Sequence, residues 1–170
     1  LFAETSATEI IGLDISQGML DIGKKKIEAK NLNSKIQMVL GDGEKIPYTD
    51  NYFDVITVAY GVRNFENLEK GLSEILRVLK PNGTFIILET SVPTKFPFKQ
   101  GYYVYTNFIM PTIGKLFSKD KKAYSYLSNS AQNFPFGEAL NNILQKIGFI
   151  DVKDLPQTMG VATIYKATKK

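Results

Sequence analysis

The sequence predicts an α/β fold with a mostly parallel sheet, and three features support this. Short apolar segments alternate with amphipathic helical patterns, polar residues directly follow the apolar segments, and the last two apolar segments have no helix between them. Alternating strands and helices form right-handed crossovers and parallel strand pairs. The helix-free connection near the end of the chain predicts an antiparallel pair at one edge of the sheet. The 170 residues are enough for one domain.

Each element has its own local signal. The expected strands are residues 9–13, 36–40, 53–60, 84–89, 149–155 and 161–167. The expected helices are residues 16–29, with Ser16 as N-cap, then 68–79, 98–117, 119–129 and 139–147. Pro81-Asn82-Gly83 is expected to end the second helix, and Gly148 the last one. Residues 53–60 (FDVITVAY) are apolar and β-branched, as in a central parallel strand.

Composition excludes several classes of chemistry. The chain has neither cysteine nor histidine, which excludes disulfides, thiolate metal sites and histidine-based catalysis. Acid–base work must therefore fall to Asp, Glu, Tyr, Lys or water, and we expect no metal site. The net charge of +4 is too small for a dedicated nucleic-acid binder, and no run of about 18 apolar residues would span a membrane. The first residues lack the pattern of a signal peptide.

Two acids follow neighbouring strands of the predicted sheet. Asp14 ends the first strand, and Asp42 follows the second between Gly41 and Gly43. Ligands of open α/β sheets bind at the carboxyl ends of the strands, where one carboxylate would accept ribose hydroxyls and the other an exocyclic amine. The pair therefore favours an adenosine over a metal. The alternative is that Asp14 only favours a helix N-terminus and Asp42 only forms a turn.

Longer segments carry a family resemblance. They are GLDISQGML (12–20), GDGEKIPYTDNYFDVITVAYGVRNF (41–65), EILRVLKPNGTFIILE (74–89), and YSYLS (124–128) with FP (134–135). From about residue 9 to the end, the chain resembles the class I S-adenosylmethionine-dependent methyltransferases. Within that class it is similar to the ubiquinone/menaquinone biosynthesis C-methyltransferases. The GVRNF segment with the later YxYL and FP segments is the most specific part.

The resemblance implies roles for individual residues. For the S-adenosylmethionine cofactor they are Asp14 on the ribose, Ile15 and Met19 beside the adenine, Asp42 and Gly43 on the adenine amine and ring edge, and Ala59 near the methionine. The family more often has Ala where Gly43 stands. Arg63 and Asn64 match the pair that faces the quinol ring, where Arg63 would stabilise a phenolate. The alternative for Arg63 is an ion pair with Glu66 or Glu69. The proton of the ring hydroxyl is expected to leave through water, with Tyr60 and Tyr48 as weaker candidates.

The resemblance also implies a segment before residue 1. The family's first strand and its D-x-x-x-G-x-G loop have no counterpart here, so we expect a single methyltransferase domain over 1–170 that is partial at its N-terminus. A helical lid insert is expected over 96–130, which holds nine of the 20 aromatic residues among lysines. It would cover a lipophilic quinol and rest on an anionic membrane surface, or else simply pack its aromatic residues into the core.

The expected function is therefore S-adenosylmethionine-dependent C-methylation of a prenylated quinol, demethylmenaquinol or its ubiquinone-side equivalent. The expected setting is a bacterial cytoplasm, with peripheral membrane contact, room for a homodimer and no nucleic-acid partner. Two alternatives stay open: a class I methyltransferase with another small acceptor, and a non-catalytic fragment that acts as a binding module.

Overall fold

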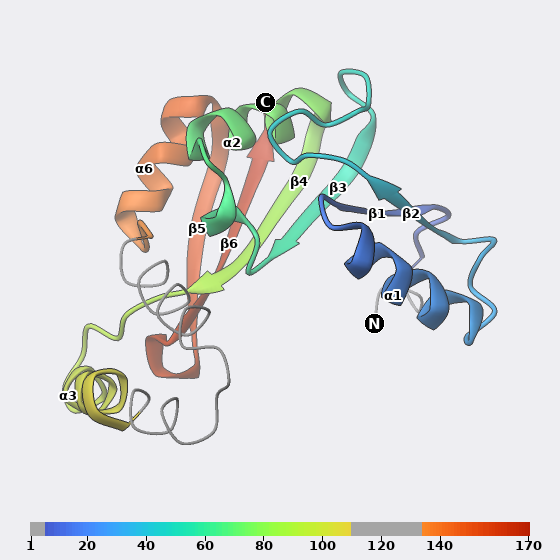
Figure 1. Ribbon diagram of the computed structural model, residues 1–170. Coiled ribbons are helices and arrows are strands. Elements are labelled where there is room, and N and C mark those ends of the chain that lie inside the picture. Colours follow the sequence, from blue (N-terminus) through green and yellow to red (C-terminus); the bar gives the residue numbers. More distant parts are fainter. Residues whose placement is uncertain (1–5, 110–133) are drawn as a thin grey trace.

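The computed structural model describes residues 6–109 and 134–170 (Figure 1). In chain order its elements are β1 (Ile10–Asp14), α1 (Gln17–Glu28), β2 (Ile36–Leu40), β3 (Phe53–Ala59), η2 (Val62–Asn64), α2 (Leu68–Val78), β4 (Leu79–Thr90), α3 (Phe98–Val104), η3 (Tyr105–Ile109), α6 (Glu138–Ile147), β5 (Phe149–Gln157), η4 (Thr158–Gly160) and β6 (Ala162–Lys169). None of the helices in these ranges has the length and apolar character needed to cross a bilayer.

The strands form two hydrogen-bonded sheets. β1 pairs with β2 in parallel, and the other four strands lie in the order β3-β4-β6-β5. β3 and β4 are parallel, whereas β6 is antiparallel to both β4 and β5. The mixed α/β architecture and the antiparallel edge pair at the end of the chain are thus confirmed.

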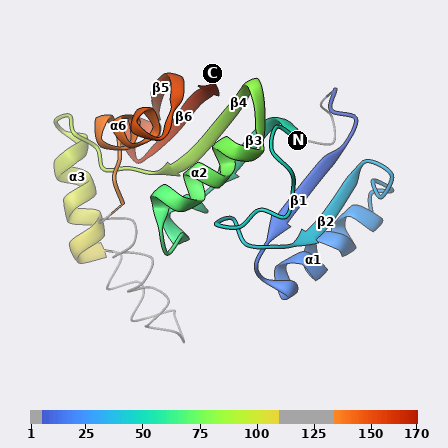
Figure 2. The same ribbon diagram turned by 90° about the horizontal axis from the view of Figure 1, so that it is seen from above.

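A break separates the two sheets. No ladder joins β1 to β3 in the described residues, and β1 lies on the β3 side of its own sheet in both views (Figures 1 and 2). β3 is therefore an edge strand here, and the prediction of a buried central strand for residues 53–60 is wrong for the described chain. Val55 shows the consequence, because this apolar strand residue is 54% exposed. The resemblance predicted a further strand in this part of the sheet.

The small β1-α1-β2 unit packs around a methionine. Ser16 caps α1 as predicted, with its hydroxyl accepting a hydrogen bond from the Met19 N–H. A Cβ on Gly12 would lie 2.7 Å from the Met38 sulfur, and one on Gly23 would lie 2.7 Å from its methyl carbon. Both glycines thus make room for one side chain, which fills the space between β1 and α1.

The main core lies on the four-stranded sheet. Buried apolar residues of the helices pack against buried residues of the strands. The helices contribute Leu72 and Ile75 from α2 and Leu140 and Leu144 from α6, and the strands contribute Phe85 and Ile87 from β4, Phe149 from β5 and Tyr165 from β6. α6 ends at Gly148 in the left-handed conformation, with φ at 119°, which glycine adopts without strain. This end of the helix was predicted.

Two predicted boundaries differ from the structure. β4 begins at Leu79 and not at residue 84, because the chain passes straight from α2 into the sheet and Leu79 pairs with Phe53. The predicted turn at Pro81-Asn82-Gly83 becomes an irregularity of this strand, with Asn82 at a φ of 63°. Of the helix expected over 98–117, residues 98–109 are helical as α3 and η3. The rest of it and the helix expected over 119–129 lie outside the described residues.

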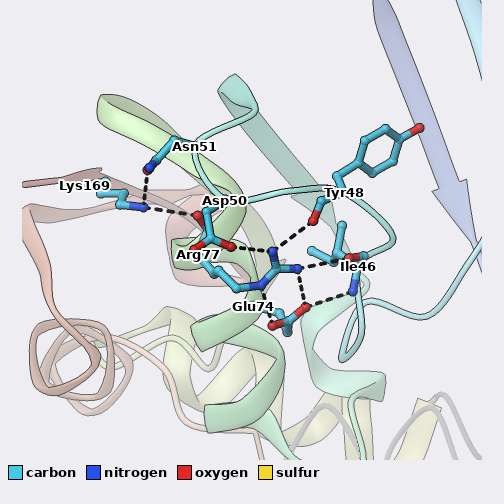
Figure 3. Close-up of polar contacts among 7 residues, drawn as sticks. All are labelled: Ile46, Tyr48, Asp50, Asn51, Glu74, Arg77 and Lys169. Carbon is cyan, nitrogen blue, oxygen red and sulfur yellow. Dashed lines mark hydrogen bonds and ion pairs between the residues drawn. The ribbon is translucent and has the colours of Figure 1, made fainter.

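One arginine ties the segment before β3 to α2 (Figure 3). Arg77 donates to both oxygens of Glu74, at 2.8 Å each, and to Asp50 at 2.8 Å. It also donates to the backbone carbonyls of Tyr48, at 2.9 Å, and Ile46, at 3.0 Å. These five hydrogen bonds use all the donors of the guanidinium. The hydrogen bonds from Arg77 also hold the pKa of the Glu74 carboxyl below its usual range.

The ends of this segment have further anchors. Glu74 accepts a hydrogen bond from the Ile46 N–H at 3.0 Å. Lys169 donates to the side chain of Asn51 at 2.8 Å and to the Arg77 carbonyl at 3.2 Å. Residues 46–51, which link the two sheets, are therefore held to α2 and β6 by polar contacts.

We expect Arg77→Met to destabilise the fold by about 2–3 kcal/mol at neutral pH, because Glu74 and two carbonyls lose their donors. The lowered pKa of Glu74 makes its contribution present above the ordinary value of 4.5 and lost as the pH falls through the lowered value. The difference between the two proteins, measured by urea unfolding, should therefore shrink as the pH falls below 4.5. Lys80→Met is the control, because the Lys80–Asp54 pair is exposed and worth under about 0.5 kcal/mol. An equal loss in both variants would contradict this role.

Candidate functional site

The structure brings the two predicted acids together. Asp14 pairs with Leu40 across the ladder, and its backbone carbonyl accepts a hydrogen bond from the Gly41 N–H at 3.0 Å, so Asp42 directly follows a residue that is hydrogen-bonded to Asp14. Oδ1 of Asp14 accepts from the Ser16 N–H at 2.8 Å, and Oδ1 of Asp42 from the Glu44 N–H at 2.8 Å. These are the turn contacts of the alternative interpretation. They leave Oδ2 of each acid unused by any hydrogen bond in the described residues.

Large apolar side chains stand exposed beside these acids. Ile15 is 74% exposed and Met19 is 57% exposed. Both follow Asp14 at the start of α1, so a carboxylate and an apolar surface lie at one place. A nucleoside presents the same combination of ribose hydroxyls and a flat apolar base.

The loop after β2 packs against the segment after β3. A Cβ on Gly43 would lie 2.7 Å from the Phe65 ring, and one on Gly71 would lie closer still to its opposite edge. The Phe65 ring therefore lies between Gly43 and Gly71 and leaves no room for a methyl group at either position. Glu44 adds a polar contact by accepting from the Asn67 N–H at 3.1 Å. These contacts bring together two segments at the same end of the molecule. One is the loop after β2 that holds Asp42 (the Asp42 loop), and the other is the segment after β3 that holds Arg63 (the Arg63 segment).

Arg63 is held by an acid on the neighbouring strand. Its Nη1 donates to Oε1 of Glu89 at 2.6 Å, and the Glu89 side chain is fully buried. The alternative of a pair with Glu66 or Glu69 is therefore wrong, since Glu69 pairs with Lys146 at 3.1 Å. The guanidinium carbon also lies 5.7 Å from the centre of the Tyr60 ring, within range of a cation–π interaction.

The backbone around Arg63 is a compact turn. Tyr60 has a φ of 54°, and its N–H donates to the Leu88 carbonyl at 2.8 Å, just after Ala59 ends β3. Asn64 Nδ2 donates to the Tyr60 carbonyl at 3.3 Å. The turn places Ala59, Tyr60, Arg63 and Asn64 together at the carboxyl end of β3. Tyr60 is 43% exposed there.

Tyr48 does not join this group. Its ring packs against Tyr52 and Phe53, with ring centres 4.9 and 5.0 Å apart. Burial, followed by the neighbouring Tyr52, raises the pKa of its hydroxyl. A raised pKa keeps the hydroxyl protonated at neutral pH, which makes Tyr48 a poor proton acceptor.

Sequence reasoning overlooked two residues of this region. Phe65 was part of the GVRNF segment, but nothing local showed that Gly43 and Gly71 enclose its ring. Glu89 was only the last residue of the strand expected over 84–89 and was given no role. An available signal was that β3 and β4 are sequential parallel strands, so an acid ending one and an arginine following the other meet at the same edge.

Known proteins provide an independent comparison. Residues 2–169 match the ubiE/COQ5 methyltransferase family. The chain is 45% identical over 166 residues to a demethylmenaquinone methyltransferase of Bacteroides fragilis, covering 98% of this chain and 68% of that protein. It is 42% identical over 161 residues to a demethylmenaquinone methyltransferase of Bacillus cereus, covering 95% of this chain and 68% of that protein.

Solved structures agree on the fold. A putative S-adenosyl-L-methionine-dependent methyltransferase from Methanococcus maripaludis matches with a TM-score of 0.62 and 25% identity, over 95% of this chain and 67% of that one. The [4+2]-cyclase SpnF matches with a TM-score of 0.69 and 18% identity, over 99% of this chain and 68% of that one. The second likeness shows the fold alone, since one fold hosts different reactions.

The enclosed ring of Phe65 gives a stability test. We expect Gly43→Ala to lower stability by about 1–3 kcal/mol, because the new methyl meets a ring that Gly71 prevents from moving away. Adding Phe65→Leu to Gly43→Ala should recover part of this loss. Gly101→Ala is the control, since a Cβ there has nothing within 4 Å. Thermal unfolding measures all three, and an unchanged melting temperature for Gly43→Ala would contradict the packing.

Proposed function

Because the chain belongs to the ubiE/COQ5 methyltransferase family, we propose that it methylates a ring carbon of a prenylated quinol, converting a demethylmenaquinol to a menaquinol. The observation that carries the proposal is the contact between the Asp42 loop and the Arg63 segment through Phe65. This contact supports the proposal because it brings the loop with the acid proposed for the adenine close to the segment with the arginine proposed for the phenolate. The bacterial relatives of 42–45% identity, both named for this reaction, support the choice of acceptor.

The residues present fit S-adenosylmethionine, the methyl donor that the family uses. Asp14 would hold the ribose hydroxyls with its unused oxygen, and Asp42 would accept from the adenine amine. Ile15 and Met19 would cover the base, and Ala59, with no more than a methyl group, leaves space at the end of β3. When bound, the cofactor supplies a methyl group on a positively charged sulfur, which is electrophilic without a metal.

The protein's task on the quinol side is to orient the ring and stabilise its oxyanion. Arg63 provides a rigid, permanently charged donor at the carboxyl end of β3. Asn64 and Tyr60 would orient the ring, because the same turn holds both. Correct alignment of two reactants alone supplies several kcal/mol of the barrier reduction.

A cofactor titration separates this proposal from a non-catalytic binding module. We expect S-adenosylhomocysteine, titrated calorimetrically, to bind the chain extended upstream with the corresponding segment of the Bacteroides relative. Asp14→Asn should weaken binding about 10- to 100-fold, since one charge-assisted hydrogen bond contributes about 1.5–3 kcal/mol. Asp21→Asn is the matched control, because Asp21 lies on α1 and, among the described residues, accepts a hydrogen bond only from the Gln17 side chain. Equal binding by both variants would contradict the role of Asp14.

The chain as printed belongs in the same titration. Equal binding with and without the extension would show that the described acids hold the nucleoside by themselves. A folded extended protein that ignores the ligand would refute the methyltransferase proposal. Methylation of another phenol in preference to a demethylmenaquinol would favour the alternative of a different small acceptor.

The segment before and within α3 supports membrane contact as part of this function. Phe96 is 79% exposed, Phe98 is 41% exposed and Val104 is 48% exposed, with Lys95 and Lys99 beside them. Exposed apolar residues next to lysines are typical of helices that lie on anionic membrane surfaces. A surface of this kind would bring the chain to a substrate dissolved in lipid.

We expect the chain to sediment with vesicles that contain phosphatidylglycerol and to stay in solution with phosphatidylcholine alone. The double change Phe96→Ser/Val104→Ser should lower the bound fraction at least about tenfold, because it removes two apolar side chains worth over 1 kcal/mol. Ile22→Ser on α1 is the control, since Ile22 is also 50% exposed but belongs to the other sheet unit. Equal loss in both variants would refute a specific surface.

A further inference from the structure

Two carboxylates are buried among the described residues, and their surroundings differ. Glu44 has partners for both oxygens: Oε1 accepts from the Asn67 N–H at 3.1 Å, and Oε2 lies 3.6 Å from the Lys70 ammonium. Glu89 accepts all of its hydrogen bonds from the described residues on one oxygen. Its Oε1 receives Arg63 at 2.6 Å, the Thr90 N–H at 2.8 Å and the Thr90 hydroxyl at 3.3 Å. Its Oε2 is buried with no hydrogen-bond partner in the described residues.

Arg63, the partner of Glu89, also has a polar atom without a hydrogen bond among the described residues. Arg63 Nε is likewise buried without a hydrogen bond in the described part of the chain. Leaving a buried charged group unsatisfied costs at least about 1–3 kcal/mol, and native structures contain few such groups. Here an unused acceptor and an unused donor belong to one ion pair. A hydroxyl group can both donate to the first and accept from the second.

We propose that Glu89 is the proton acceptor of the reaction and that Arg63 changes partner as the proton moves. This proposal rests on the function proposed above. The quinol O–H bond breaks, its proton passes to Glu89 Oε2, and the electron pair stays on the ring oxygen. Arg63 then leaves the neutral carboxylic acid and pairs with the phenolate. The Glu89 side chain is fully buried and that of Arg63 is 10% exposed, so the proposal requires Arg63 to move aside before a substrate hydroxyl can reach Oε2.

The proton balance closes over one cycle. Once the ring carbon carries the new methyl group, its own hydrogen leaves to water as a proton, and the bonding electrons restore the aromatic ring. The ring oxygen takes back the proton from the Glu89 carboxylic acid. Glu89 becomes a carboxylate again and recovers Arg63. No oxidant, metal or second protein base is needed, because water accepts the proton from the ring carbon.

The other ionisable groups around Glu89 are poorer acceptors. Arg63 on η2 is a permanent cation, and the Tyr60 ring packs beside its guanidinium. Tyr165 on β6 is buried, which raises the pKa of its hydroxyl, and the negative charge of Glu89 adds to this. Its oxygen also accepts a hydrogen bond from the Gly137 N–H at 2.7 Å. The hydroxyls of Thr90 and Thr163 complete the surroundings and do not ionise in this pH range.

The first test is Glu89→Gln in the form of the chain that binds S-adenosylhomocysteine. We expect kcat to fall at least about 100-fold with KM changed less than about threefold, because a general base contributes about 10²- to 10⁴-fold. We also expect kcat of the parent protein to fall at low pH, and this fall to be absent from Glu89→Gln. Glu69→Gln, which removes an exposed pair with Lys146, should keep activity within about twofold. A folded Glu89→Gln protein with the parent kcat and pH profile overturns the proposal.

A second readout needs no turnover. 4-Nitrophenol is colourless when neutral and yellow when ionised. In acidic buffer with S-adenosylhomocysteine, the parent protein should turn it yellow without releasing a proton to the buffer, because Glu89 takes that proton. Glu89→Gln should lose the colour, whereas Glu89→Asp should keep it in part, which covers the case in which the glutamine variant does not fold. No colour with the parent protein at any nitrophenol concentration overturns the proposal.

The two proposals fail in different ways. If the extended protein binds no cofactor and methylates no quinol, the proposed function fails. If it methylates quinol and Glu89→Gln does so equally well with the same pH profile, only the role of Glu89 fails.

Discussion

The position of the candidate site depends on the five hydrogen bonds of Arg77. β1, α1 and β2 form one unit, the four-stranded sheet forms another, and no strand ladder joins them in the described residues. Residues 46–51 run from one unit to the other, and Arg77 and Lys169 hold this segment to α2 and β6. A free loop of this length would let the two units move independently. The anchored loop makes the distance between Asp42 and Arg63 a property of the fold, which a reaction between two bound molecules requires.

Phe65 applies the same constraint within the site. Its ring fills the space that a Cβ on Gly43 or Gly71 would need. A phenylalanine ring in this place therefore requires glycine at both positions. This explains in physical terms why glycine stands where the family more often has alanine. An alanine at position 43 requires a differently placed ring, and the ring sits two residues after Arg63. A substitution at position 43 in the Asp42 loop would therefore alter the position of Arg63, which is proposed to face the acceptor.

Local signals were enough to predict most of the elements. Ser16 caps α1, Gly148 ends α6, and residues 36–40 form β2 as the apolar pattern indicates. The wrong predictions concern residues whose structure depends on a partner far away in the sequence. Leu79 belongs to a strand because Phe53 pairs with it, and Val55 is exposed because no described strand covers it. The positions of Asp14 and Asp42 at the ends of β1 and β2 were predicted, since strand ends are visible in sequence. The partner of Arg63 was missed, because it lies 26 residues away and only strand register brings it near.

The pair of Arg63 and Glu89 changes what an arginine at this position can do. A free guanidinium attracts a phenolate strongly, whereas one already bound to a carboxylate carries little net charge towards a third group. Glu89 is fully buried, and water therefore does little to weaken its attraction for Arg63. An arginine so engaged stabilises an oxyanion well only if the carboxylate loses its charge at the moment when the oxyanion forms. Proton transfer from the substrate hydroxyl to Glu89 achieves this within the pair itself, and the total charge of the buried site stays constant during that transfer. A site without histidine can in this way combine the base and the oxyanion stabiliser in two side chains that hold each other in place.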